Sequence, residues 1–286
     1  MNERSGSNLK AKLILLAGVF SCSMSSAFFR YMTAPSTIAA TYRLGWTVLL
    51  LTPLIFSKRE TRKELLSLKG KDLAFCGLSG LFLAMHFVVW FESLSNTSIA
   101  SSTVLVNTEV AFAAFGYLIF FGKKIRKKEI LAIGIAFLGS VVIAMADTGG
   151  GAGKNAVLGD ILALLAAFFS ACYTLIGTRE RSHMSTMVYT YVLYWGCFLS
   201  LLVFDAVSGV PMTGYEPINW IMSLCLAVFC TLLGHSVFSW SLKFLTPTYV
   251  STVKLAGPVF ASISAILLFG EIPGLIQVAG AAVVLA

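Results

Sequence analysis

Ten long apolar segments follow one another along the chain with only short polar breaks, and this pattern limits what it can fold into. A helix that crosses the hydrocarbon core of a bilayer needs about 20 mostly apolar residues. Only 12% of the residues are charged, whereas soluble domains carry roughly a quarter. The sequence therefore predicts an all-α integral membrane protein with ten transmembrane helices. We expect the spans at 11–29, 37–56, 73–94, 98–121, 130–146, 158–178, 186–205, 217–240, 247–269 and 272–286.

The two ends of this pattern allow other interpretations. The first span has a basic start and a small-residue patch at Ser21-Cys22-Ser23, which a cleaved signal peptide would also show. Its apolar stretch continues to Phe29 and similar segments follow, so a transmembrane helix is the better interpretation. The last span is short for a crossing, which suggests that the sequence is clipped at its C-terminus.

The six cysteines all lie inside predicted spans without metal-ligand spacing, and we expect them to be packing residues.

The basic residues predict an orientation. With the N-terminus in the cytoplasm, 17 of the 21 lysines and arginines fall in the N-terminal tail or in inner connections, and only Arg30 and Lys154 fall outside. The positive-inside rule then puts both termini in the cytoplasm. We expect the protein in the cytoplasmic membrane of a bacterium. The net charge of +8 is thereby explained by orientation and contact with membrane lipid, and we expect no nucleic-acid partner.

The two halves of the chain resemble each other. Residues 93–122 align without a gap on 241–270, at an offset of 148, and six positions are identical. Because each half has five predicted spans, the second half enters the membrane from the opposite face. The sequence thus predicts a 5+5 inverted-topology repeat with a central cavity and a binding site near the midplane. The predicted parts are a cytoplasmic tail (1–10), a first repeat (11–146), an external linker (147–156) and a second repeat (157–286).

Four short motifs stand out in the second half: Gly234-His235, Trp240-Ser241-Leu242-Lys243, Gly257-Pro258-Val259-Phe260 and Leu268-Phe269-Gly270-Glu271. Together with the ten spans and Arg43 in the second span, they resemble the EamA-type members of the drug/metabolite transporter superfamily over essentially the whole chain. The first half matches less well, since Glu109-Val110 stands where that family often has a proline and Lys123 where it often has a glutamate. The resemblance implies a 5+5 transporter whose cavity is lined by the first four helices of each repeat, and it implies no particular substrate.

Two of the charged residues inside predicted spans are the leading candidates for a substrate site. A charge at the centre of a membrane helix costs about 2.5 to 3.5 kcal/mol on insertion scales, so such residues are informative. Glu109 lies near the middle of the fourth span and Lys254 in the ninth, where it aligns with Val106, one helical turn before Glu109. Lys254 could meet a substrate carboxylate and Glu109 an amine or a proton. The alternative is a structural ion pair, or a side chain that reaches the interface.

Aromatic and polar residues on the same spans extend this candidate site. His86 and His235 occupy related positions in the third and eighth spans, and a tryptophan follows each of them, Trp90 and Trp240. An imidazole beside a cavity could carry a coupled proton, and Trp90 could provide an aromatic wall. Simple packing between helices explains these residues equally well. Asn107 is a weaker candidate, and Arg43, nearer the outer end of its span, could serve pairing or vestibule lining.

Other classes of function find less support. The glycine-rich stretch Thr148–Asn155 lacks the first glycine and the Ser/Thr of a phosphate loop, and no segment is long enough for an ATPase domain. We find no clustered catalytic constellation, so we expect no enzyme, no metal site and no cofactor. The sequence predicts a secondary transporter for a small polar metabolite, such as an amino acid, with export as the leading direction and a proton as a candidate coupling ion. An uptake permease for a nucleotide precursor, sugar or other metabolite is the alternative, and a scaffold without transport a weaker one.

Overall fold

The computed structural model describes residues 2–122 and 155–270, together with a few short stretches between 130 and 135 and between 274 and 282. Within this part of the chain, every regular element is a helix. The elements are α1 (Asn2–Ser23), α2 (Ser25–Arg30), α3 (Ser36–Ser57), α4 (Arg59–Leu66), α5 (Gly70–Asn96), α6 (Ile99–Val106), α7 (Glu109–Phe121), α9 (Ala156–Glu180), α10 (Thr186–Ser208), α11 (Pro217–Cys225), the π-helical η1 (Leu226–His235), α12 (Ser236–Ser241), α13 (Pro247–Lys254) and α14 (Gly257–Phe269).

Eight helical stretches among the described residues are long and apolar enough to cross a membrane. They are Leu9–Arg30, Ser36–Ser57, Gly70–Asn96, Ser101–Phe121, Ala156–Glu180, Thr186–Ser208, Pro217–Ser241 and Pro247–Phe269. Each coincides with one predicted span to within a few residues. The predicted spans 130–146 and 272–286, and nearly all of the linker 147–156, lie outside the described residues, so the count of ten stays a prediction.

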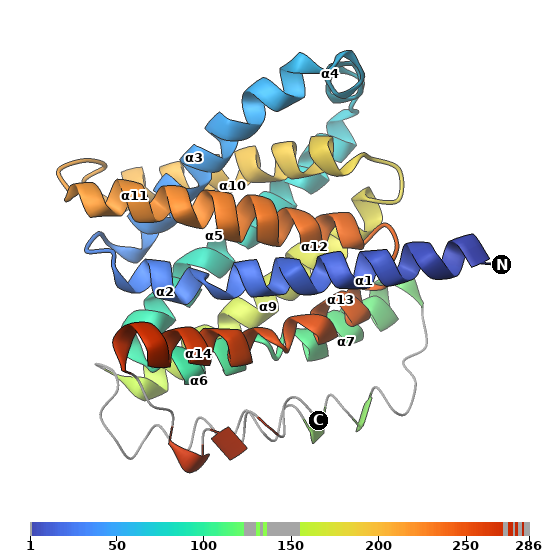
Figure 1. Ribbon diagram of the computed structural model, residues 1–286. Coiled ribbons are helices and arrows are strands. Elements are labelled where there is room, and N and C mark those ends of the chain that lie inside the picture. The colour runs from blue at the N-terminus through green and yellow to red at the C-terminus, as the bar shows by residue number, and fades with distance from the viewer. Residues whose placement is uncertain are drawn as a thin grey trace.

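The connections between these stretches gather at two ends of the bundle (Figure 1). At one end the backbone amide of Ser185 donates to Glu64 Oε1 over 2.6 Å, which joins the turn before α10 to α4. At the other end the amides of Thr33 and Ala34 donate to Asn219 Oδ1, each over 2.9 Å. We call them the α4 end and the α2 end. The basic segments at 57–72 and 179–181 both lie at the α4 end, as the predicted topology requires.

The surface and the interior of the bundle are those of a membrane protein. Large apolar side chains cover the outside, among them Leu267 and Phe120, where they can contact lipid. Serines and threonines are buried between helices, where their hydroxyls bond to backbone or to one another. The central α5 packs on α3, α9 and α10. It approaches α10 so closely at Gly80 that an added Cβ would lie 2.6 Å from the Cys197 amide nitrogen.

Candidate functional site

Two of the membrane-length stretches are interrupted, and the interruptions lie at equivalent positions. The stretch α6–α7 breaks at Asn107–Thr108 and α13–α14 breaks at Leu255–Ala256, which are separated by the same offset of 148 found in the sequence alignment. Their starts match as well: the Ser98 hydroxyl accepts from the Ser101 amide at 3.1 Å, and the Thr246 hydroxyl from the Tyr249 amide at 3.2 Å. Both side chains are N-caps.

The two breaks have different local causes. Pro258 has no N–H to donate to the Lys254 carbonyl, so irregular backbone is expected there, and α13 indeed ends at Lys254. No proline follows Asn107, and the sequence analysis did not anticipate a break within the span 98–121. Instead Asn107 Nδ2 donates to the Thr103 carbonyl at 2.6 Å and Thr108 Oγ1 to the Leu105 carbonyl at 2.7 Å. These side chains take the place of the backbone donors that a continuous helix would supply.

The interrupted helices run past each other in opposite directions, because α13 packs against α7 while α14 packs against α6 (Figure 1). This arrangement brings the two breaks together. Lys254 at the C-terminus of α13 donates to Glu109 Oε1 at the N-terminus of α7, with an Nζ–Oε1 distance of 2.6 Å. A helix C-terminus favours a cation and an N-terminus favours an anion, so both helix dipoles stabilise the pair as it is arranged.

The Glu109–Lys254 ion pair is shielded from solvent but not enclosed by apolar groups alone. The side chains of Glu109 and Lys254 are 3% and 12% exposed. The Ser170 hydroxyl of α9 donates to Glu109 Oε2, and the Lys254 ammonium lies 5.0 Å from the centre of the Phe238 ring. Both carboxylate oxygens of Glu109 and the ammonium of Lys254 therefore have a partner, and a buried ion pair is stable only when its charged atoms are paired in this way.

The ion pair also forms part of the wall of a cavity. The cavity holds about 80 Å³ of free space, enough for several water molecules but well below the roughly 300 Å³ of the smallest usual ligand pockets. A metabolite would thus need the cavity to widen. The sequence left open whether Glu109 and Lys254 pair or face a cavity, and the structure combines both. The residues lining it are Val19, Cys22, Ser23, Ser26, His86, Trp90, Thr103, Val106, Asn107, Glu109, Ser170, His235, Phe238, Lys254 and Gly257.

The two histidines meet in the wall of the same cavity. The ring centres of His86 and His235 are 6.2 Å apart, and Trp90 stacks on His86 with a centroid distance of 6.1 Å and an interplanar angle of 9°. His86 Nδ1 lies 2.9 Å from the Ala166 carbonyl, which makes that nitrogen the donor and leaves Nε2 as an acceptor. His235 Nδ1 lies 3.1 Å from the Tyr173 hydroxyl. The π-helical turn of η1 ends at His235 and sets its position.

Six of the eight predicted site residues thus line one cavity, and two lie elsewhere. Trp240 packs on Phe244, with ring centres 4.8 Å apart. Arg43 is fully buried between helices, where its Nε donates to Thr231 Oγ1 at 2.7 Å and its guanidinium lies 4.1 Å from the Phe87 ring centre. Sequence reasoning missed Ser170 and Tyr173, because a hydroxyl on an apolar helix usually forms a hydrogen bond to a neighbouring helix and has no other role.

A bundle of apolar helices with two antiparallel interrupted helices, and a charged pair where they meet, is the architecture of a multi-pass membrane transporter. Comparison with known proteins agrees. The model of the EamA-like transporter family matches residues 9–145 and 157–286, and the chain belongs to this family.

Individual relatives are more distant. An uncharacterized transporter of Clostridium kluyveri is 27% identical over 231 residues, which cover 78% of this chain and 72% of the relative. A probable amino-acid metabolite efflux pump of Salmonella typhimurium is 27% identical over 176 residues, 58% of each protein. A solved crystal structure with 15% identity superposes with a TM-score of 0.68 over 96% of both chains, which shows a shared fold.

Proposed function

We propose that this transporter is a secondary carrier that moves an amino acid or a related small polar metabolite out of the cell by alternating access. The observation that carries the proposal is the Glu109–Lys254 pair, which spans two interrupted helices and lines the central cavity. Interrupted helices at membrane depth are typical of substrate sites, because their ends offer dipoles and free backbone groups to a ligand.

The pair suits a zwitterion for an electrostatic reason. A compound with one ammonium and one carboxylate can separate Glu109 from Lys254 and satisfy both, its ammonium on Glu109 and its carboxylate on Lys254. No charge is then left without a partner. A neutral sugar that separated Glu109 from Lys254 would leave both of their charges without an opposite charge. Because an uncompensated buried charge costs several kcal/mol, the site should discriminate strongly against ligands that carry only one of the two groups.

The remaining cavity residues supply the rest of the site in this proposal. Trp90 and His86 form a flat stacked wall against which an apolar side chain of the substrate can lie. Asn107, at the break between α6 and α7, offers an amide oxygen, since its Nδ2 is already bonded to Thr103. A coupling proton would bind Glu109 after the substrate has left and before the Glu109–Lys254 pair forms again, so that the proton and the substrate ammonium use this carboxylate in turn.

Alternating access requires that the two halves rock against each other, and the proposed 5+5 inverted repeat provides this symmetry. Two observations support the repeat: the breaks share one offset, and the family model matches two consecutive segments. The small free volume of the cavity fits a state in which water can reach the site but a metabolite does not fit. Export and a bacterial cytoplasmic membrane are proposed because one relative, from Salmonella typhimurium, is named as an efflux pump and the basic segments 57–72 and 179–181 lie at one end of the bundle.

The test is efflux from proteoliposomes loaded with an equimolar mixture of amino acids, organic acids and sugars, with release followed by mass spectrometry. We expect release of one or a few zwitterionic compounds by the wild type and by Glu216→Gln, a control at an exposed residue of the α2 end. The Glu109→Gln/Lys254→Met variant should release none. Release of sugars alone, or equal release by both variants, would refute the proposed site.

A further inference from the structure

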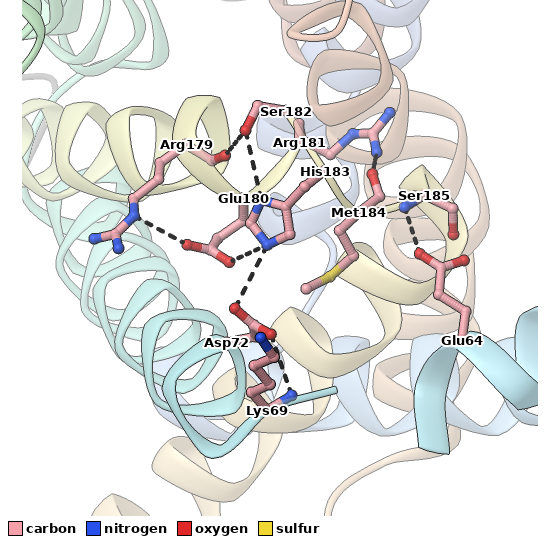
Figure 2. A network of polar contacts seen from close by, with 10 residues as sticks. All are labelled: Glu64, Lys69, Asp72, Arg179, Glu180, Arg181, Ser182, His183, Met184 and Ser185. Carbon is pink, nitrogen blue, oxygen red and sulfur yellow. Dashed lines mark hydrogen bonds and ion pairs between the residues drawn. The ribbon is translucent and has the colours of Figure 1, made fainter. Parts of the chain in front are cut away.

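We propose that Asp72, Glu180 and His183 form a binding site for a divalent transition-metal ion at the α4 end, where it would tie α5 to α9. The three side chains come from the start of α5, the end of α9 and the turn that follows it, and they converge on one point (Figure 2). This point is separate from the cavity, since none of the three residues lines it.

The local backbone positions each side chain. Asp72 is the third residue of α5, where its Oδ2 accepts from the Lys69 amide at 3.1 Å in a capping box, which leaves Oδ1 free to face His183. The turn after α9 is fixed by bonds from the amides of His183 and Met184 to the Glu180 carbonyl, at 3.3 and 3.0 Å. This turn places the His183 imidazole over the Glu180 carboxylate, three residues earlier.

The distances between the ligand atoms suit a metal. His183 Nε2 lies 3.5 Å from Asp72 Oδ1 and 3.5 Å from Glu180 Oε2, and all three atoms lie within 4.8 Å of one another. Metal bonds of about 2.0 to 2.2 Å in a tetrahedral site separate neighbouring ligand atoms by about 3.3 to 3.6 Å. The two distances from His183 already match this spacing, and the two carboxylate oxygens, at most 4.8 Å apart, would have to approach each other to complete three corners of a tetrahedron. A water molecule can occupy the fourth corner.

A second observation points to a cation. The Glu180 side chain is 1% exposed, and its Oε2 has no hydrogen-bond partner among the described residues. The other oxygen, Oε1, faces the Arg179 Nε at 3.6 Å. A buried carboxylate oxygen without a donor carries a large desolvation cost, which a metal ion at the point of convergence would remove. His183, whose side chain is 51% exposed, leaves a route for the ion to enter.

The histidine also has the orientation of a metal ligand. Its Nδ1 lies 3.5 Å from the Ser182 hydroxyl, so that Nε2 faces the carboxylates (Figure 2). Ligating histidines usually use the second ring nitrogen in this way. One imidazole and two carboxylates suit Zn²⁺ or Mn²⁺. The Arg179 guanidinium opposes a cation here, so we expect weaker binding than in a structural zinc site with four ligands.

The test is a titration of the purified, chelator-stripped protein in detergent with Zn²⁺ and with Mn²⁺, in which binding is measured by isothermal titration calorimetry. The wild type should bind one ion at this site. Loss of a residue that hydrogen-bonds to a metal ligand typically weakens metal binding about 10- to 100-fold. His183→Gln and Asp72→Asn change the ligands themselves, so they should weaken binding at least as much. Glu60→Gln is the matched control, because Glu60 is an exposed acid at the same end. Any metal bound by the cysteines would be bound equally by the wild type and all variants, and so would not produce a difference between them.

Thermal unfolding gives a second readout that does not depend on heat of binding. Metal should raise the melting temperature of the wild type and of Glu60→Gln, but not that of His183→Gln, because an ion that binds only the folded state stabilises it. Equal metal affinity in the wild type and His183→Gln would overturn the proposal. So would a stabilisation that depends on His183 and on acidic pH but not on metal, since a proton would then be the bridging cation.

Discussion

Replacing Lys254 with methionine removes the cation that neutralises Glu109, whose side chain is 3% exposed and bonded to Lys254 Nζ at 2.6 Å. Removing one partner of a buried ion pair typically costs about 3 to 5 kcal/mol. Because the Lys254 side chain is 12% exposed and water can reach the cavity, we expect the lower value, about 3 kcal/mol.

The second substitution in this experiment is Glu109→Gln. Glutamine keeps an oxygen that can accept from the Ser170 hydroxyl, and the double variant Glu109→Gln/Lys254→Met contains no stranded charge. Replacing a whole buried pair by neutral groups is often nearly neutral for stability, so the double variant should recover to within about 1 kcal/mol of the wild type.

The free energy of unfolding would be measured by denaturant titration in detergent, with Lys243→Met as the control at an exposed lysine. The control should stay within about 0.5 kcal/mol of the wild type. If Lys254→Met is as stable as the control, or if the double variant is no more stable than the single one, the two residues are not coupled. If the double variant regains both stability and substrate affinity, the ion pair has only a structural role and does not bind the substrate.

Three further predictions concern the cavity and the packing around it. Trp90→Phe keeps the aromatic wall but removes the indole N–H, which is buried without a hydrogen-bond partner among the described residues; if this N–H donates to the substrate, affinity should fall about 5- to 10-fold, the value of one hydrogen bond, and an unchanged affinity would exclude that hydrogen bond. Glu109→Gln should abolish transport driven by a pH gradient and, because Glu109 is also the proposed ligand of the substrate ammonium, should weaken counterflow exchange as well; gradient-driven transport at the wild-type rate would place the coupled proton elsewhere. Gly80→Ala should destabilise the bundle by about 1 to 3 kcal/mol, because its Cβ would meet α10 backbone, whereas Gly77→Ala, with open space around it, should have little effect in the same unfolding assay.

Sequence reasoning located the eight membrane-length stretches of the described residues, because twenty-residue apolar runs have few other uses. The break after Lys254 also follows from the sequence, since Pro258, four residues later, removes a helical donor. The break at Asn107–Thr108 was missed, because its cause is a pair of side-chain bonds to carbonyls and not a proline. The signal was present as the polar triplet Asn107-Thr108-Glu109 within an apolar run.

Which residues meet depends on how helices cross, and the sequence does not contain that information directly. The offset of 148 placed Lys254 near the equivalent of Glu109, but only the antiparallel passage of α6–α7 and α13–α14 makes them partners. Arg43 shared the same sequence signal, a charge inside a span, yet it is held among hydroxyls and a phenylalanine ring. The cluster of Asp72, Glu180 and His183 escaped notice because Asp72 lies far from the other two residues in the sequence.

The native residue Cys22 allows a direct test of alternating access, since it lines the cavity. A variant that keeps Cys22 and replaces the other five cysteines by alanine would be reconstituted in liposomes and exposed to a charged, membrane-impermeant thiol reagent from each side in turn. Alternating access predicts that Cys22 reacts from both sides, and that the transported compound slows both reactions. Labelling from one side only, unaffected by any compound that the protein releases, would contradict transport through this cavity.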